Sequence, residues 1–286
     1  MSATRISVRR RTARWDPDAE VSVADAMDFW SFAAAAANVV MQLAWPEVGY
    51  GVAESRVDSG SILKHPWKRL RTTSQYLAVA VFGSEEDRAS FREAVDAAHR
   101  QVISTPESPV RYNAFDRRLQ MWVAACLFVG LEDTYLLLRG EMTPEQADQF
   151  YRSAWTLGTT LQVAEDQWPP TRAEFDAYWD DACARVAMDE PVRRYLSDLI
   201  NLRMINPLLG LTFRPLQKFL TAGFLAPVFR DALGLRWGPG RQLLFEWLFL
   251  AVAFVNRFLP VFIRQGGSHI LLADVRRRVR ARSALV

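Results

Sequence analysis

The chain has 286 residues, of which 50% are hydrophobic and 23% charged, and its formal net charge is +3. This composition is sufficient for a sizeable globular core and excludes a disordered chain. The basic runs Arg9–Arg11 and Arg276–Arg282 are too short, and too far from stacking aromatics, for a nucleic-acid-binding protein. Cys126 and Cys183 lie far apart, so we expect free thiols and a cytoplasmic protein.

The N-terminal part is expected to be a flexible basic arm over residues 1–21, without the apolar segment of a signal peptide. Residues 22–286 are predicted to form one all-α domain, because helical periodicity dominates and no alternating strand pattern rivals it. Ser22 is placed to cap the first helix, which runs from Val23 to about Leu43. A turn-rich segment, Pro46–Pro66, follows this helix.

Further helices are predicted in the middle of the chain. Their starts are marked by capping residues or by proline in the first turn, and two of their ends are marked by glycine. They run from Trp67 to about Phe82, Glu85 to Val102, Asp116 to about Arg139 and Thr143 to about Thr160, and two more open at Pro169 and Glu190.

The segment Leu243–Ile263 is apolar and long enough to cross a bilayer. However, it contains Glu246 and Arg257, and each charge at a bilayer centre costs about 2.5–3.5 kcal/mol. We therefore expect a C-terminal apolar helix, about residues 241–264, that packs on the domain and does not span a membrane. With the basic tail 276–286 after it, peripheral contact with a membrane surface is a further expectation.

His99 differs from the other two histidines because it lies inside a strongly predicted helix. It borders an apolar stripe made by Phe91, Val95, Ala98 and Val102. An imidazole in such a place can serve a metal, a haem iron or proton transfer. The alternative is a partly buried histidine that is bonded to a backbone carbonyl, and the helix alone favours that alternative.

A polar face opens the preceding helix, where Lys68, Arg71 and Thr72 have i, i+3, i+4 spacing. Two cations and a hydroxyl suit a carboxylate, such as a haem propionate, or bound dioxygen and its reduced forms. The alternative is a solvated helix face. The sequence has no P-loop, no dinucleotide-binding glycine motif, no Cys-x-x-Cys-His and no nucleophile elbow.

Nine short motifs follow one another in an order and spacing that are together specific. Through them the chain resembles, over roughly residues 30–280, the haem-associated oxygenase family that includes the MpaB oxygenase and bacterial latex clearing protein, in its actinobacterial form. The motifs are Met41–Glu54, Pro66–Thr72, Phe82–Gly83, His99–Val102, Tyr112–Asp116, Leu119–Val123, Leu157–Gly158, Trp168–Pro169 and Leu220–Pro227.

The resemblance implies that His99 is the proximal ligand of a non-covalent b-type haem held between helices. It also places Lys68, Arg71 and Thr72 in the polar motif near the haem. In latex clearing protein this motif reads Arg-x-x-Lys-Thr, so the two cations are exchanged here, and arginine is a poor reversible iron ligand. Many relatives carry histidines where this chain has Trp45 and Ala124, which leaves His99 as the ligand candidate.

The leading hypothesis is a haem b-dependent oxygenase that acts with dioxygen on a hydrophobic, isoprenoid or lipid-like substrate. Arg71 and Thr72 would then be catalytic, stabilising reduced oxygen or holding a propionate. The second hypothesis is a non-catalytic haem- or hydrophobic-ligand-binding all-α protein. The third is a structural all-α protein in which His99 is only a core residue. The electron donor is not identified by the sequence.

Overall fold

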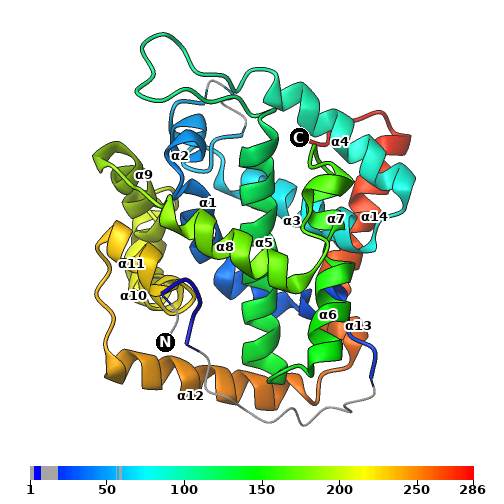
Figure 1. The fold of residues 1–286 in the computed structure, drawn as a ribbon, viewed down its shortest axis with the longest axis vertical. Helices are drawn as coiled ribbons and strands as arrows, with labels where there is room; N and C mark the ends of the chain where they lie inside the picture. The colour runs from blue at the N-terminus through cyan, green and yellow to red at the C-terminus, as the bar shows by residue number, and fades with distance from the viewer. Residues whose placement is uncertain (1–2, 8–18, 56, 58–59) are drawn as a thin grey trace.

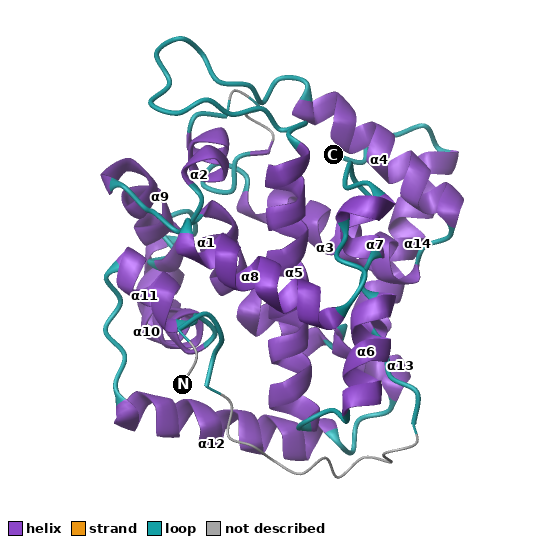
Figure 2. Ribbon diagram, viewed as in Figure 1, coloured by secondary structure: helices purple, strands orange, loops and turns teal. Residues whose placement is uncertain are grey.

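The computed structural model describes residues 3–7, 19–55, 57 and 60–286. Every regular element in this part of the chain is a helix, and the only β-type pairing there is an isolated bridge between Ile103 and Asn113 (Figure 2). The predicted all-α class is confirmed, and the helices form a single domain. Most of the arm expected at the N-terminus, residues 8–18, lies outside the described residues.

Most of the described helices follow one another with short connections, and the longest connection, residues 100–116, lies between α4 and α5. In chain order they are η1 Val23–Ala26, η2 Phe29–Ala34, α1 Ala35–Leu43, α2 Pro46–Ala53, α3 Pro66–Phe82, α4 Glu85–His99, α5 Arg117–Arg139, α6 Pro144–Ser153, α7 Thr156–Thr159, η4 Glu165–Gln167, α8 Arg172–Ala184, α9 Glu190–Ile200, α10 Pro207–Gly223, α11 Pro227–Leu233, α12 Pro239–Asn256, α13 Val261–Arg264 and α14 Gly266–Arg280.

Helix α5 is the centre of the fold, and the other helices are arranged around it (Figure 1). It packs against α1, α7 and α12, which come from both halves of the chain. Within the described residues it is the one helix whose length and hydropathy fit a membrane span, but 89% of its apolar window is buried inside the protein. A helix that is apolar on all sides and covered by other helices is the core helix of a globular domain.

Helix starts agree with the capping signals in the sequence. The Ser84 hydroxyl accepts a hydrogen bond from the backbone N–H of Asp87, and the Asp87 carboxylate accepts one from the backbone N–H of Ser84. Thr143 forms the same reciprocal box at the start of α6. At the end of α5, Gly140 has φ 92°, a conformation that favours glycine. These local signals are independent of tertiary packing, which is why they could be found in advance.

The first predicted helix, Val23–Leu43, is interrupted in the structure by two short 3-10 helices around Asp28. The Asp28 carboxylate is buried and accepts hydrogen bonds from Arg139 Nη2 at 2.9 Å, Asn256 Nδ2 at 3.0 Å and Arg264 Nη1 at 3.1 Å. A buried charge is tolerated only when it is paired and hydrogen-bonded. The backbone therefore departs from the α-helix where this side chain enters the interior.

The C-terminal part contains more regular structure than expected. The apolar segment forms α12, which ends at Asn256, and the short α13 follows after Pro260. Arginines of the basic tail lie in α14, which packs along α3. There Arg276 pairs with Asp87 of α4 at 2.8 Å. Helices α2 and α10 were also not expected, since a turn-rich segment was predicted where α2 forms.

Candidate functional site

His99 is the last residue of α4, at the point where the chain leaves the helix. The backbone N–H of Val102 donates to the His99 carbonyl at 2.9 Å, and the N–H of Ala114 donates to the Val102 carbonyl at 2.9 Å. The Phe115 ring meets the imidazole edge-on, with centroids 6.3 Å apart. Val102 is thus hydrogen-bonded to the last residue of α4. The imidazole lies between α4 and the part of the loop that carries Phe115.

The His99 side chain is partly buried, and its Nδ1 atom is buried without a hydrogen-bond partner among the described residues. Burial and the nearby Arg69 guanidinium lower the pKa of His99 from 6.5 to about 4, against the opposing effect of Asp96. The imidazole is therefore neutral at pH 7, which is the protonation state that binds a metal. The backbone carbonyl bond required by the alternative interpretation is not made by Nδ1.

Arg69 is the cation that acts on His99, and the sequence analysis did not select it. It lies in the first turn of α3 and is solvent-accessible, yet burial lowers the pKa of its guanidinium. Tyr195 of α9 opposes this shift, and the Tyr195 hydroxyl is buried without a hydrogen-bond partner in the described part of the chain. Side chains from α3, α4 and α9 thus lie near one another around the Arg69 guanidinium.

The three side chains that the sequence selected on α3 are Lys68, Arg71 and Thr72, and one of them is hydrogen-bonded within the helix itself. The Thr72 hydroxyl is buried and donates to the backbone carbonyl of Lys68 at 2.9 Å, one turn earlier on the same helix. Arg71 Nε is buried without a partner among the described residues. Between these three side chains and His99, no hydrogen bond or ion pair is present in the part of the chain that the structure describes. Arg69 and Tyr195 could not be found from spacing, because their proximity depends on how α9 packs.

Trp45 and Ala124 are core residues. The Trp45 indole donates to the Ala182 carbonyl at 3.0 Å and stacks on Trp122, with centroids 4.8 Å apart. Trp122 in turn stacks on Trp179 at 5.3 Å. Ala124 is 2% exposed in the middle of α5. These two positions contribute packing and no imidazole, as the sequence indicated.

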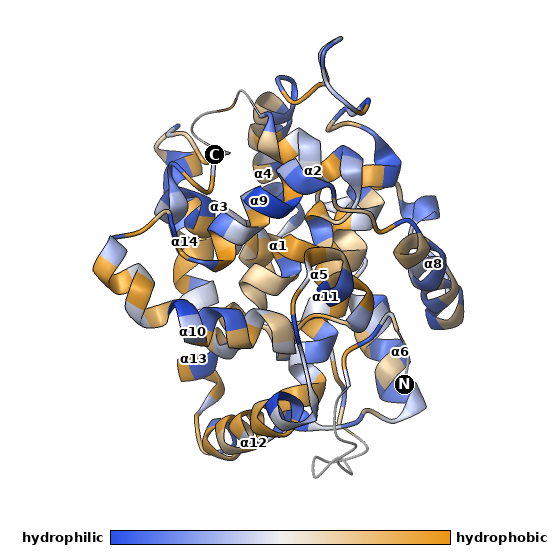
Figure 3. Cartoon of the chain, turned by 90° about the vertical axis from the view of Figure 1, so that its left-hand side faces the viewer, coloured by the Kyte–Doolittle hydropathy of each residue, from blue (hydrophilic) through white to orange (hydrophobic). Residues whose placement is uncertain are grey.

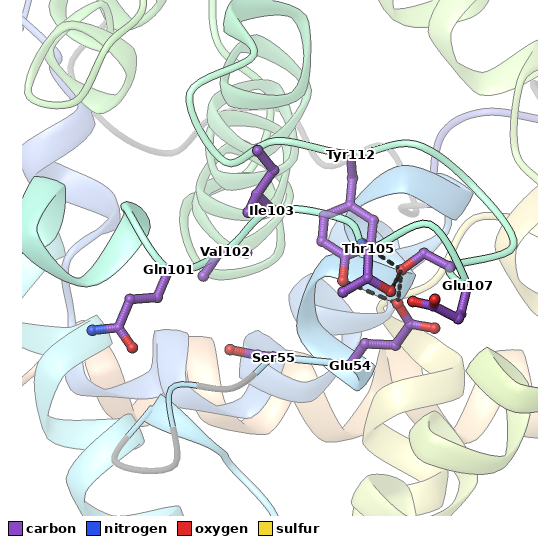
Figure 4. Close-up of a pocket in the computed structure, with 9 residues that line it drawn as sticks. Glu54, Ser55, Gln101, Val102, Ile103, Thr105, Glu107 and Tyr112 are labelled. Carbon is purple, nitrogen blue, oxygen red and sulfur yellow. Dashed lines mark hydrogen bonds between the residues drawn. The ribbon is translucent and has the colours of Figure 1, made fainter.

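A small polar pocket lies beside the loop that follows His99 (Figure 4). The Glu54 carboxylate accepts hydrogen bonds from Ser108 Oγ at 2.7 Å and Tyr112 Oη at 3.0 Å. The pocket volume is about 190 Å³. Because small-molecule sites usually occupy about 300–1,000 Å³, this pocket is too small for a large apolar substrate.

The residues around His99 fit a haem. A neutral imidazole with a free nitrogen can ligate iron, and Arg69 and Arg71 offer guanidinium groups that suit propionate carboxylates. No group of three or more His, Cys, Asp or Glu side chains that could hold a metal ion occurs among residues 3–7, 19–55, 57 and 60–286.

The imidazole at the end of α4 is neutral at pH 7 and lies near the Arg69 guanidinium. The chain belongs to the family of catalytic domains of the ER-bound oxygenase mpaB/B' and rubber oxygenase, whose profile matches residues 25–254. This confirms the resemblance seen in the sequence motifs.

The chain is also similar to two mycobacterial proteins. These are the uncharacterized proteins Rv2237 of Mycobacterium tuberculosis and Mb2261 of Mycobacterium bovis. Each is 48% identical over 249 residues, a match that covers 86% of this chain and 96% of the relative. No solved structure matches the chain significantly.

Proposed function

We propose that the protein is a haem b-dependent oxygenase that acts with dioxygen on a hydrophobic, isoprenoid or lipid-like substrate. His99 is the proposed iron ligand, and Lys68, Arg71 and Thr72 are proposed to lie at the haem, as the resemblance implied. The proposal is carried by one observation: His99 Nδ1 is buried and without a partner in the described part of the chain, on an imidazole that is neutral at pH 7. Membership of an oxygenase family supports it.

A bound haem would supply the site for dioxygen and the oxidising chemistry. The protein itself would position the haem and set the charges around it. His99 would hold the iron, and burial together with the Arg69 guanidinium keeps the free imidazole unprotonated. Arg71, whose buried Nε–H has no partner in the described part of the chain, would donate to a propionate carboxylate.

Two further groups have more limited roles in this proposal. The Thr72 hydroxyl proton is used within α3, so Thr72 can act on a ligand only as an acceptor or after rotation. The Tyr195 hydroxyl has no hydrogen-bond partner in the described part of the chain and lies near Arg69, so it is an available proton donor. Tyr195 is thus a second polar candidate from a different helix.

The alternative remains a haem- or hydrophobic-ligand-binding protein without turnover. Trp45 favours it, because its stacked indole occupies a place where many relatives carry a histidine. Loss of a proton carrier at that place would leave haem binding intact and remove part of the catalytic machinery.

The visible spectrum of the purified protein, before and after dithionite, tests the cofactor. We expect a Soret band that His99→Ala abolishes and that His269→Ala, on the exposed side of α14, retains. A protein without a Soret band after reconstitution with hemin, or an unaltered band in His99→Ala, would contradict the assignment. Oxygen consumption with squalene as the hydrophobic probe then separates an oxygenase from a binding protein.

A further inference from the structure

Helix α12 is apolar on the face that packs inward and on the face that points outward. Inward, Phe245 and Phe249 are buried and meet the Phe224 ring at 5.2 and 5.1 Å. Outward, Trp247 is 58% exposed and Phe254 is 66% exposed. A surface helix of a globular protein normally carries polar residues on its outer face. The exposed side of α12 is therefore unlike an ordinary solvated face.

The outward residues form one continuous stripe. Leu244, Trp247, Phe254 and Phe258 recur at helical spacing along α12 and just beyond its end. Helix α13, which follows α12 in the chain, adds the exposed residues Phe262 and Ile263. We call these six residues the α12–α13 apolar surface. Figure 1 shows α12 lying across one end of the molecule, and Figure 3 shows it as largely hydrophobic.

The size of this surface exceeds what isolated exposed residues produce. An aromatic side chain can bury about 150–250 Å², so four aromatic rings that are more than half exposed present roughly 400–650 Å². The largest apolar patch of a typical monomer is about 300–600 Å² and is often functional. Four rings on one stripe already reach that range.

The charges around the surface are predominantly positive. Residues 203–273 contain eight Lys or Arg and two Asp or Glu, whereas the whole chain has 35 and 32, and six of the eight cations lie outside the core because only Arg230 and Arg264 are buried. Arg241 and Arg257 are exposed at the two ends of α12, and Lys218 is exposed on the neighbouring α10. The carboxylate of Glu246, one of the two acids, accepts a hydrogen bond from Gln242 at 2.9 Å. Apolar rings with flanking cations are complementary to an anionic lipid surface.

This charge pattern disfavours a second copy of the chain as the occupant. Two such surfaces face to face would bring like charges together, which is costly at an interface. A membrane span by α12 is also disfavoured, because its inner face is packed on α5 and α10. We propose that the α12–α13 apolar surface binds peripherally to bilayers that contain anionic phospholipid. This inference does not depend on the haem.

Co-sedimentation of the full chain with vesicles tests the proposal. We expect binding to vesicles of phosphatidylcholine and phosphatidylglycerol, weaker binding to phosphatidylcholine alone, and a decrease at high salt. Trp247→Glu is expected to weaken binding to the anionic vesicles by roughly tenfold or more, since a buried aromatic side chain contributes about 1.5–3 kcal/mol. Arg257→Gln should reduce binding to anionic vesicles only.

Trp155→Glu is the matched control, because Trp155 is 40% exposed between α6 and α7, away from this surface. Circular dichroism verifies that each variant is folded. The proposal is overturned if the wild-type chain stays in the supernatant with anionic vesicles, or if Trp247→Glu and the control bind alike. It is also overturned if the chain is a dimer that Trp247→Glu converts to a monomer without any change in vesicle binding.

Discussion

Two regions of the molecule bury polar side chains, and they differ in whether those side chains find partners. At Asp28 the carboxylate is held by three groups from α5, α12 and α13, and Asn256 also accepts from Trp30 Nε1 at 3.1 Å. At His99 the imidazole Nδ1 is buried without a partner among the described residues, and so is the Tyr195 hydroxyl beside Arg69. The Asp28 carboxylate therefore has its hydrogen bonds within the protein, whereas the His99 imidazole does not.

This difference separates a structural cluster from a binding site. Buried polar groups without partners are costly, so a fold retains them mainly where another molecule satisfies them. The Asp28 cluster includes one such atom, Arg139 Nη1, but the same guanidinium also lies over the Tyr135 ring at 5.4 Å. Around His99 no comparable compensation exists for Nδ1 within the described residues, apart from the edge of Phe115.

The largest effect is expected from Asp28→Ala. This change leaves the guanidinium groups of Arg139 and Arg264 buried without their counter-ion. Breaking a buried pair by removing one partner costs about 3–5 kcal/mol, so urea denaturation should show a decrease of that size in the free energy of unfolding. Glu190→Ala, in exposed ion pairs with Arg193 and Arg194, is the control and should cost about 0–1 kcal/mol. Equal losses in the two variants would show that the Asp28 cluster is not structural.

A smaller effect is expected from the titration of His99 in the protein without haem. Its pKa is about 4 when folded and 6.5 when unfolded, so between these values the unfolded chain binds more protons. Stability contributed by His99 is therefore present above pH 6.5 and is lost as the pH falls toward 4, by no more than about 3 kcal/mol. His99→Ala should remove this part of the pH dependence of unfolding. A wild-type pH profile identical to that of the variant would mean that the imidazole is not desolvated.

Arg71→Ala is expected to change haem retention more than stability. Arg71 is partly exposed and forms no ion pair with the described residues, so the free energy of unfolding should change by about 0–1 kcal/mol. Faster transfer of haem to apomyoglobin, followed at the Soret band, is the expected result. Arg88→Ala, which removes an i, i+3 ion pair with the exposed Glu85 on α4, is the control and should leave the transfer rate unchanged. Retention equal to wild type would place Arg71 outside the haem site.

The smallest effect is expected from Arg69→Ala. Without this guanidinium the pKa of His99 should rise toward its ordinary value, because one of the two causes that lower it is removed. Nuclear magnetic resonance titration of the imidazole in the protein without haem measures the shift. Arg71→Ala should produce a smaller shift, since Arg71 does not contribute to the lowered pKa. The reverse order would assign to Arg71, and not to Arg69, the positive charge that lowers the pKa of His99.

The sequence predicted those elements whose signals are local. Ser84, Thr143 and Gly140 mark helix boundaries through contacts within a few residues, and the structure has boundaries there. The break at Asp28 was missed because its partners lie more than 100 residues away. Helix α2 was missed because glycines in Met41–Glu54 suggested turns, although Gly49 and Gly51 lie where α2 packs closely against Val192 and Tyr112.

The same difference between local signals and tertiary contacts decides which residues of the candidate site could be predicted. His99 was identifiable because it combines a helical pattern with a family motif. Arg69 belongs to the same motif as Lys68 and Arg71, but it lies on a different side of α3, and spacing alone could not show which side faces His99. Tyr195 has no sequence signal of this kind, because α9 reaches the site only through tertiary packing.

The Asp28 cluster also constrains how the chain can be made. Asp28 emerges from the ribosome early, but two of its partners, Asn256 and Arg264, follow 228 and 236 residues later. Protein synthesis adds about 5–20 residues per second, so about ten seconds or more pass between the synthesis of Asp28 and that of these two partners. During that time η2 and α5 have no α12 to cover them. A nascent chain that stops before residue 264 therefore presents an unfinished core to chaperones and proteases, which gives the cell a means of distinguishing complete chains from truncated ones.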